Sequence, residues 1–208
     1  MSELATNKIS PVTGTNVTLG DSGDTFTIAS GASITGGSIA AASLTGSLPA
    51  ISGAALTGVG KVVQVVNVMN GAVATGTTTM PNDDSIPQKT EGDEYMTLAI
   101  TPTSASNKLF IEVSTVFSHS ANDQWLSGAL FQDTTAGALA SVLIREDIGT
   151  VTRIVSLNHY MAAGTTSATT FKLRVGSDTG GTTTFNGYSG RAHGGVMSSS
   201  ITITEISV

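Results

Sequence analysis

The sequence contains no cysteine, few charged residues and few aromatic residues. Without cysteine, neither a disulfide framework nor a cysteine-based metal site is possible. Charged residues make up 12% of the 208 positions, and only nine residues are lysine or arginine. That charged fraction is about half of what soluble domains usually carry. Because binding to a phosphate backbone needs clustered positive charge, we expect no nucleic-acid partner.

Long apolar runs are also absent. No run of 18 apolar residues exists, so we expect no membrane insertion. The first residues carry no apolar run after Lys8, and a signal peptide is therefore not expected either. If the protein acts outside a cell, it must leave by lysis or through a dedicated machine.

Threonine, serine, glycine and alanine dominate what is present. Threonine favours strands, while glycine and serine favour turns. No segment has the period of a convincing helix. The composition therefore predicts an all-β protein.

Residues 28–60 repeat a five-residue unit of small residues around one branched aliphatic residue. The units begin at Ala32, Gly37, Ala42 and Ala54. One such strand cannot bury enough apolar surface to offset the entropy lost on ordering. The segment is therefore either a flexible linker or a fibrous stem in which copies wind together. We favour the stem, because the aliphatic positions recur regularly and residues 25–60 carry no charge. The candidate axis residues are Ile34, Ile39, Leu44, Leu48, Ile51 and Leu56.

Three regions follow from this pattern. Residues 1–15 are polar and irregular, and we expect an attachment or mobile segment there. Residues 16–60 form the stem, which starts with a hairpin around the turn at 21–24. The two aspartates of that turn could suggest calcium, but the further oxygen ligands are missing and turn chemistry explains them. Residues 61–208 form a separate knob domain.

The knob contains nine or ten short segments with strand character, separated by turn signals. In several of them apolar and polar residues alternate, so that Leu109, Ile111 and Val113 share one face, as do Phe171, Leu173 and Val175. Evenly spaced short strands are typical of a β-sandwich, and we expect a jelly-roll-like antiparallel one. The segments are 61–69, 95–101, 109–117, 125–132, 138–145, 151–161, 168–175, 182–185 and 199–208.

Two segments are apolar on both faces, namely 61–69 and 142–144. We expect the first to be buried on both faces and to enter a hairpin at Asn70-Gly71. In a monomeric sandwich, one face of each strand is normally exposed to solvent. Segments that are apolar on both faces therefore predict a subunit interface. The acidic segment 76–94 is expected to be a solvated surface loop, with a cation site at a symmetry axis as the alternative.

Several long segments resemble one family of proteins. SIPQKTEGDEYMTLAITPTSASNKLFIEV, LNHYMAAGTTSATTFKLRVG and GTTTFNGYSGRAHGGVMSSSITITEIS resemble the C-terminal domains of tail-fibre and related virion-fibre proteins of tailed bacteriophages, particularly phages of marine bacteria. LPAISGAALTGV and TLGDSGDTFTIASGASIT resemble the stem repeats that precede such domains. The resemblance implies a homotrimeric fibre with a slender stem and a β-sandwich knob.

The resemblance also implies partners and a location. The fibre would be a virion component, assembled in the host cytoplasm and released by lysis, with its N-terminus bound to other virion structural proteins. Its knob would contact a host surface glycan or protein. A capsid-attached head fibre or decoration protein is the alternative. A glycan-degrading tailspike is less favoured, because no paired carboxylates, nucleophile elbow or phosphate-binding loop is recognisable. We therefore expect no enzymatic activity and no cofactor.

Candidate receptor contacts are residues with a large apolar face and a polar tip, or residues in glycine-rich loops. We expect Tyr160 to be buried instead, because it lies in an apolar strand. The histidines lack metal-ligand spacing, so we expect no metal site within one chain. The receptor candidates are Trp125, Tyr188, Arg191 and His193.

Overall fold

The computed structural model describes residues 62–208. The predicted attachment segment, hairpin and stem lie outside the described residues. So do the candidate axis residues Ile34, Ile39, Leu44, Leu48, Ile51 and Leu56.

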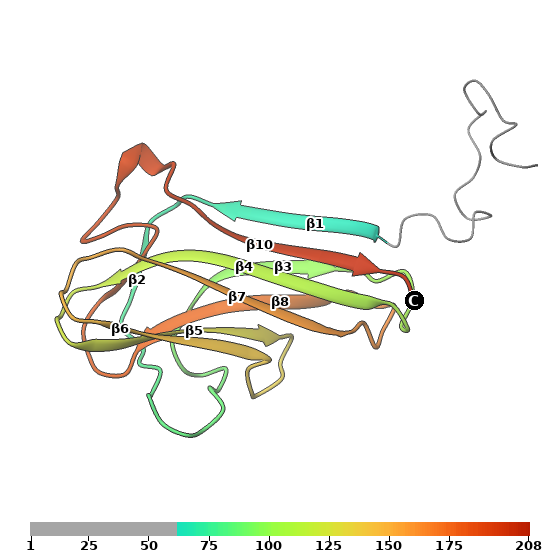
Figure 1. Ribbon diagram of the computed structural model, residues 1–208, viewed down its shortest axis with the longest axis horizontal. Coiled ribbons are helices and arrows are strands. Elements are labelled where there is room, and N and C mark those ends of the chain that lie inside the picture. The colour runs from blue at the N-terminus through green and yellow to red at the C-terminus, as the bar shows by residue number, and fades with distance from the viewer. Residues whose placement is uncertain (1–61) are drawn as a thin grey trace, which may run out of the picture. The chain divides into compact units, whose positions relative to one another are not determined.

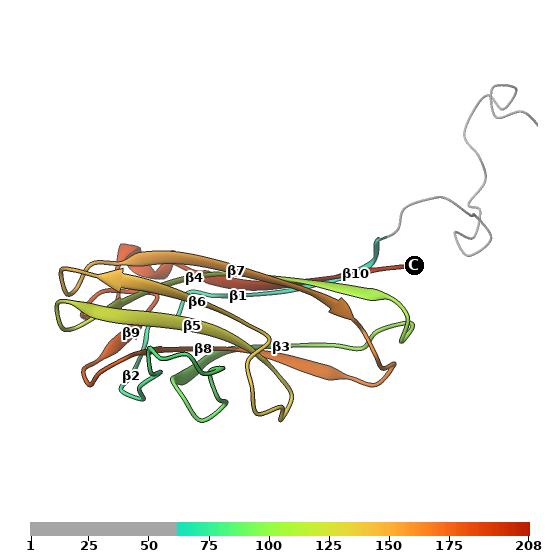
Figure 2. The same ribbon diagram turned by 60° about the horizontal axis from the view of Figure 1, so that its bottom comes forward.

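Residues 62–208 fold into two antiparallel sheets that face each other (Figures 1 and 2). They contain ten strands, one 3-10 helix and no α-helix. The elements are β1 (Val62–Asn70), β2 (Ala74–Gly76), β3 (Asp93–Ile100), β4 (Lys108–His119), β5 (Gln124–Gln132), β6 (Ala140–Glu146), β7 (Arg153–Ala162), β8 (Thr169–Ser177), β9 (Thr183–Phe185), η3 (His193–Gly195) and β10 (Ser199–Ile206).

The strand order is that of a jelly roll. One sheet runs β1-β10-β4-β7, and the other runs β3-β8-β5-β6. The short strands β9 and β2 extend the first sheet beside the end of β4. Consecutive long strands mostly alternate between the sheets, so nearly every pairing joins distant parts of the chain. The predicted all-β, jelly-roll-like sandwich is confirmed for residues 62–208.

Alternating side chains build the core between the sheets. Leu109, Ile111 and Phe117 of β4 are fully buried, and Glu112 between them is exposed. The inward faces of β8 and β10 are also as the alternation predicts. Burial of each such side chain contributes roughly 1.5–3 kcal/mol. Further fully buried core residues are Leu126, Leu130, Phe171, Leu173, Phe185, Ile201 and Ile203.

The prediction for the first strand was wrong in two respects. β1 pairs only with β10 and is an edge strand, so it is not buried on both faces in one chain. Val65 and Met69 point away from the core and are 55% and 68% exposed. Asn70-Gly71 does not form a hairpin, because the chain leaves the β1 pairing there and enters β2, which pairs with β9.

The acidic segment is more firmly held than a solvated loop would be. Met80 is fully buried and packs on Ala129 and Phe131 at the outer face of the four-stranded sheet. Its backbone N–H donates to the Ser177 carbonyl at 2.7 Å. The segment therefore covers part of this sheet before β3 begins at Asp93.

A buried carboxylate fastens β10 to the loop before β4. Glu205 accepts hydrogen bonds from Gln64 Nε2 and Asn107 Nδ2, each at 2.6 Å, and from both the N–H and hydroxyl of Thr103 at 2.8 Å. Burial alone would raise the pKa of Glu205, but these donors outweigh it and lower the pKa to about 2. The carboxylate is therefore charged and fully paired at neutral pH.

The two ends of the sandwich differ. Val62 pairs with Ile206, so the described chain begins and finishes at the same end. The opposite end carries connections between strands of both sheets (Figure 1). We call this opposite end the loop end, and define it by residues 71–73, 120–123, 147–152, 178–182 and 186–198.

Candidate functional site

The longest connection at the loop end contains three of the four predicted receptor contacts. Tyr188 is 54% exposed, and Arg191 and His193 are also exposed. Ser189 and His193 have φ values of 46° and 47°, in the left-handed region. Arg191 Nη2 donates to the carbonyl oxygen of Gly194, so its guanidinium partly braces its own loop. The loop therefore presents an aromatic ring, a guanidinium and an imidazole to solvent.

Buried hydrogen bonds fix the base of this loop. Asn186, which is 1% exposed, donates through Nδ2 to the carbonyls of Asn70 at 2.6 Å and Ala72 at 3.2 Å. Its Oδ1 accepts from Ser199 Oγ at 2.7 Å. An exposed tip on a fixed base loses less conformational entropy on binding than a free loop does.

The fourth predicted contact, Trp125, is separate from this loop. It lies on β5 at the outer face of the four-stranded sheet, where it is half-buried. The Arg145 guanidinium lies 5.8 Å from the ring centroid and also pairs with Asp123 and Asp147. Much of the indole surface is therefore already covered by a neighbour, and its role as a receptor contact stays a prediction.

A hollow of about 240 Å³ lies beside the Tyr188 loop. Its lining is almost entirely hydroxyl-bearing, with one histidine, His119. His119 is 1% exposed, and its Nδ1 accepts the Ala121 N–H at 3.2 Å. Its Nε2 has no hydrogen-bond partner among residues 62–208. The other lining residues are Thr75, Ser120, Thr150, Thr182, Thr184 and Ser189.

A buried glutamate holds the neighbouring loop. Glu146 is fully buried, and its Oε1 accepts the Val151 N–H at 3.1 Å. Burial raises the pKa of Glu146, while the Val151 hydrogen bond and the charge of Arg153 partly oppose that rise. Thr150, between these residues, has a φ of 65°, which is rare for a β-branched side chain.

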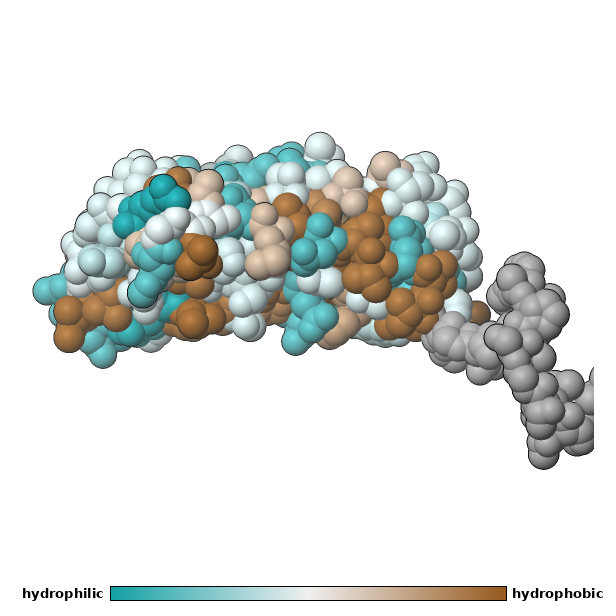
Figure 3. Space-filling model, turned by 90° about the horizontal axis from the view of Figure 1, so that it is seen from above, coloured by the Kyte–Doolittle hydropathy of each residue, from teal (hydrophilic) through white to brown (hydrophobic). Residues whose placement is uncertain are grey.

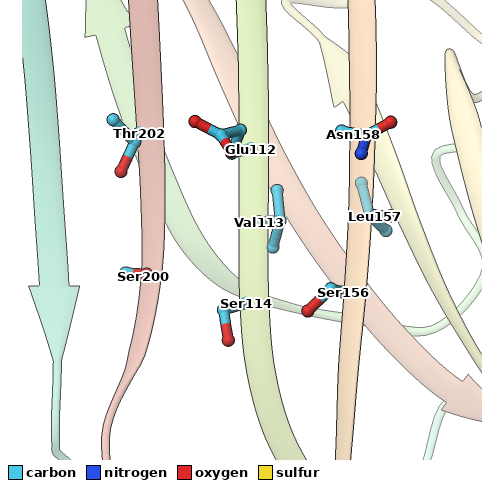
Figure 4. Close-up of a pocket in the computed structure, with 8 residues that line it drawn as sticks. All are labelled: Glu112, Val113, Ser114, Ser156, Leu157, Asn158, Ser200 and Thr202. Carbon is cyan, nitrogen blue, oxygen red and sulfur yellow. The ribbon is translucent and has the colours of Figure 1, made fainter.

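A second, shallower hollow lies on the outer face of the six-stranded sheet. Its volume is about 260 Å³, and Figure 4 shows side chains from β10, β4 and β7 around it. Glu112 lies between Thr202 and Asn158, above a row of three serines. The serines are Ser114, Ser156 and Ser200.

Tyr160 belongs to the next row of this face. It is 56% exposed and lies 6.4 Å from Phe110, measured between ring centroids. The prediction that Tyr160 is buried was therefore wrong. In β7, Val155 and Leu157 face the core and Tyr160 faces outward, so an apolar composition alone did not reveal the buried side.

The outward side of β1 forms an exposed apolar edge. We name Val62, Val63, Val65 and Met69 the β1 edge; each is between 42% and 68% exposed. Figure 3 shows apolar side chains gathered along this side, toward the end where the described chain begins. Leu143 of β6 is also 43% exposed. The sequence predicted that both strands are buried on both faces. Within one chain, these apolar side chains of β1 and β6 remain exposed.

No metal-binding cluster forms among residues 62–208, where no three histidine, aspartate or glutamate side chains come close enough to hold an ion. Within the same range there is no helix with the length and apolarity that crossing a membrane requires. The turn at 21–24 lies outside the described residues.

Sequence reasoning named the Tyr188 loop as a candidate contact, which stays a prediction, and gave no sign of the hollow beside it. His119 ends a strand and has no partner at a recognisable spacing, while the hydroxyl residues come from segments spread between Thr75 and Ser189. The only local signal was the run of threonines at 182–184.

Comparisons with known proteins give structural neighbours only. No family model matches the chain, and no curated protein matches it. Among solved structures, the infectious bursal disease virus VP2 subviral particle matches 70% of this chain with 12% identity and a TM-score of 0.34. The structure of the Gt strain of that virus matches 70% with 12% identity and a TM-score of 0.33. The C-terminal domain of EclA, a sugar-binding protein, matches 60% of this chain and 76% of its own, with 13% identity and a TM-score of 0.29. The chain spans 38% of each of the two viral chains.

Proposed function

We propose that the chain is a virion fibre protein of the tail-fibre type, and that residues 62–208 form a knob whose loop end contacts the host surface. One observation carries this proposal: the described chain begins and finishes at one end of the sandwich, and the anchored Tyr188 loop lies at the other. Residues before Val62 join the knob at the first end. The loop end lies opposite this junction, and we propose it as the side that meets a partner.

The exposed chemistry of the loop end suits binding rather than catalysis. Tyr188 combines a large apolar face with a hydroxyl, and such rings stack on sugar or peptide surfaces. Arg191 and His193 add donors beside it. Loops on a rigid β scaffold often carry recognition. We propose a host surface glycan or protein as the partner.

We further propose that the fibre is a homotrimer. β1 is an edge strand that pairs on one side only, and it exposes the valines and the methionine of the β1 edge, a feature that soluble monomers usually protect. A second copy packed there would remove this surface from water. The resemblance of residues 16–60 to fibre stems supports the same assembly.

Adsorption of the parent phage tests the role of the loop end. The purified chain is expected to occupy host receptors and reduce phage adsorption. The double variant Tyr188→Ala, Arg191→Ala should need at least about tenfold more protein for the same reduction, since losing a stacked ring and a charged donor removes more than about 1.4 kcal/mol.

Tyr160→Ala is the matched control, because Tyr160 has nearly the same exposure as Tyr188 but lies on the sheet face. It should compete as well as the unmodified chain. Equal competition by the loop variant, or no competition by the unmodified chain, would contradict the proposed contact.

A further inference from the structure

The hollow on the outer face of the six-stranded sheet is built by strand register. Glu112 of β4 lies directly between Thr202 of β10 and Asn158 of β7 (Figure 4). Two positions further along β4, Ser114 is the middle residue of the row of three serines. Because neighbouring strands lie about 4.8 Å apart and alternate residues about 7 Å apart, these two polar rows cover roughly 10 Å by 7 Å. That area corresponds to one sugar ring with its hydroxyl groups.

Larger apolar side chains lie on either side of the two polar rows. Phe110 and Tyr160 pair in the next row on one side, and Val116 and Ile154 pair on the other. Because the serines between them are short, the surface is hollowed there, to a volume of about 260 Å³. Small-ligand sites combine apolar walls of this kind with a few polar groups that fix the orientation of the ligand.

Glu112 is the only charged residue that lines this hollow. Its side chain is exposed, and it forms no ion pair among residues 62–208. An ionised carboxylate accepts hydrogen bonds through two oxygens and donates none. It therefore suits two neighbouring hydroxyl groups, each of which donates to one oxygen. It disfavours an acidic ligand, because like charges repel each other.

The other polar side chains add donors around this acceptor. Asn67 Nδ2 donates to Thr202 Oγ1 at 2.9 Å, so the hydroxyl proton of Thr202 is left to be donated elsewhere. The Asn158 amide offers both a donor and an acceptor, and each serine hydroxyl does the same. Sugar hydroxyls also donate and accept, and the lining therefore matches a neutral saccharide.

We infer that this hollow binds one neutral saccharide ring. Two adjacent hydroxyls of the ring donate to the Glu112 carboxylate, while Asn158, Thr202 and the serines bond the remaining hydroxyls. The strands that carry the site are β10, β4 and β7, so it includes neither the β1 edge nor the loop end. The inference goes beyond the proposed function, because it gives the side of the knob a second binding site.

Titration of the full, 15N-labelled chain, followed by NMR, tests the site. The probes are the methyl glycosides of glucose, galactose and mannose, with glucuronate, galacturonate and mannuronate as their acidic counterparts. We expect saturable shifts of the Ser114, Asn158 and Thr202 amides with at least one neutral sugar. Affinity for its acidic counterpart should be at least about threefold lower, because of repulsion by Glu112.

Two results of this titration would overturn the inference. One is the absence of saturable shifts at these amides with every neutral sugar, which is the result expected if a second copy of the chain covers this face. The other is equal affinity for a neutral sugar and its acidic counterpart.

Glu112→Gln separates the charge from the shape of the site. It should lower the affinity for the neutral sugar at least about tenfold and abolish the discrimination against the acidic one, since charge-assisted hydrogen bonds are lost. Asp84→Asn is the matched control, because Asp84 lines a different hollow, before β3, and its replacement changes the net charge equally. It should change neither quantity. Unchanged affinity or unchanged discrimination in Glu112→Gln would contradict the proposed contact.

Ser114→Val tests the site through its shape. Ser114 is exposed, and a β-branched residue suits a strand, so the variant is expected to fold. The added methyl groups fill the floor of the hollow and should abolish saturable binding of the neutral sugar. A folded variant that binds the sugar as tightly as the unmodified chain does would show that the ligand lies elsewhere.

The two proposals fail in different ways. If no neutral sugar shifts the Glu112 hollow but the Tyr188, Arg191 variant loses competition with phage adsorption, the sugar site is wrong and the fibre function stands. If the sugars shift the hollow as expected but the chain never competes, the proposed function is wrong and the site stands.

Discussion

Glu205 connects three parts of the knob, and its replacement should therefore lower the stability of the knob. Its carboxylate unites β10, β1 and the loop that contains Thr103 and Asn107. Glu205→Gln places an amide donor among these donors and is expected to lower the free energy of unfolding by about 2 kcal/mol at pH 7. Urea unfolding of the two proteins measures the difference.

The same residue predicts a pH dependence. Its pKa is lowered from 4.5 to about 2 on folding, so its stabilising effect is complete above pH 4.5 and is lost as the pH falls toward 2. The stability difference between the unmodified chain and Glu205→Gln should therefore shrink across this interval. Glu112→Gln, on the exposed sheet face, is the control and should show no such change. A difference that is constant from pH 7 to pH 2 would show that the Glu205 charge is not stabilising.

At the residue scale, alternation predicted burial where one face of a strand is polar. Phe171 and Leu173 alternate with Lys172 and Arg174, and the structure places them as expected. The same alternation places Tyr160 outward with Ser156 and Asn158, and the prediction failed because the strand was treated as uniformly apolar. The position of His119 depends on pairings with β9, more than sixty residues later, which no local pattern records.

At the scale of elements, most strands were predictable and their neighbours were not. Each of the nine knob segments expected from sequence matches a single strand in the structure within a few residues, and β2, with only three residues, was missed. The apolar run in β1 was mistaken for a buried strand. A central strand and an edge strand that meets another subunit have the same composition, and only the pairing distinguishes them.

The β1 edge gives a prediction about assembly. Val65→Lys together with Met69→Lys introduces two charges into the proposed subunit contact, where desolvation is costly. We expect the unmodified chain to have the mass of three copies, and the variant to dissociate at a concentration at least about tenfold higher. Light scattering over a dilution series measures this.

Ile86→Lys is the matched control, since Ile86 is 63% exposed but lies in the segment before β3. It should dissociate like the unmodified chain. A monomeric unmodified chain, or identical dilution behaviour of all three proteins, would count against a β1 interface.

At the scale of the whole molecule, the jelly roll brings together what the sequence separates. Strands that succeed one another along the chain mostly enter different sheets, and their connections therefore gather at the two ends of the sandwich. The sandwich class could be predicted from evenly spaced strands, but the hydroxyl-lined hollow at the loop end could not. The stem residues proposed for the trimer axis remain a prediction, since they lie outside residues 62–208.

A particle reconstruction by electron microscopy tests the proposed fibre most directly. We expect three copies of the knob around a common axis on the virion, with the Val62 end toward the particle and the Tyr188 loop pointing outward. Tail or capsid attachment is read from the same map. A knob present as a single copy, or one whose loop end is buried against the particle, would contradict the proposal.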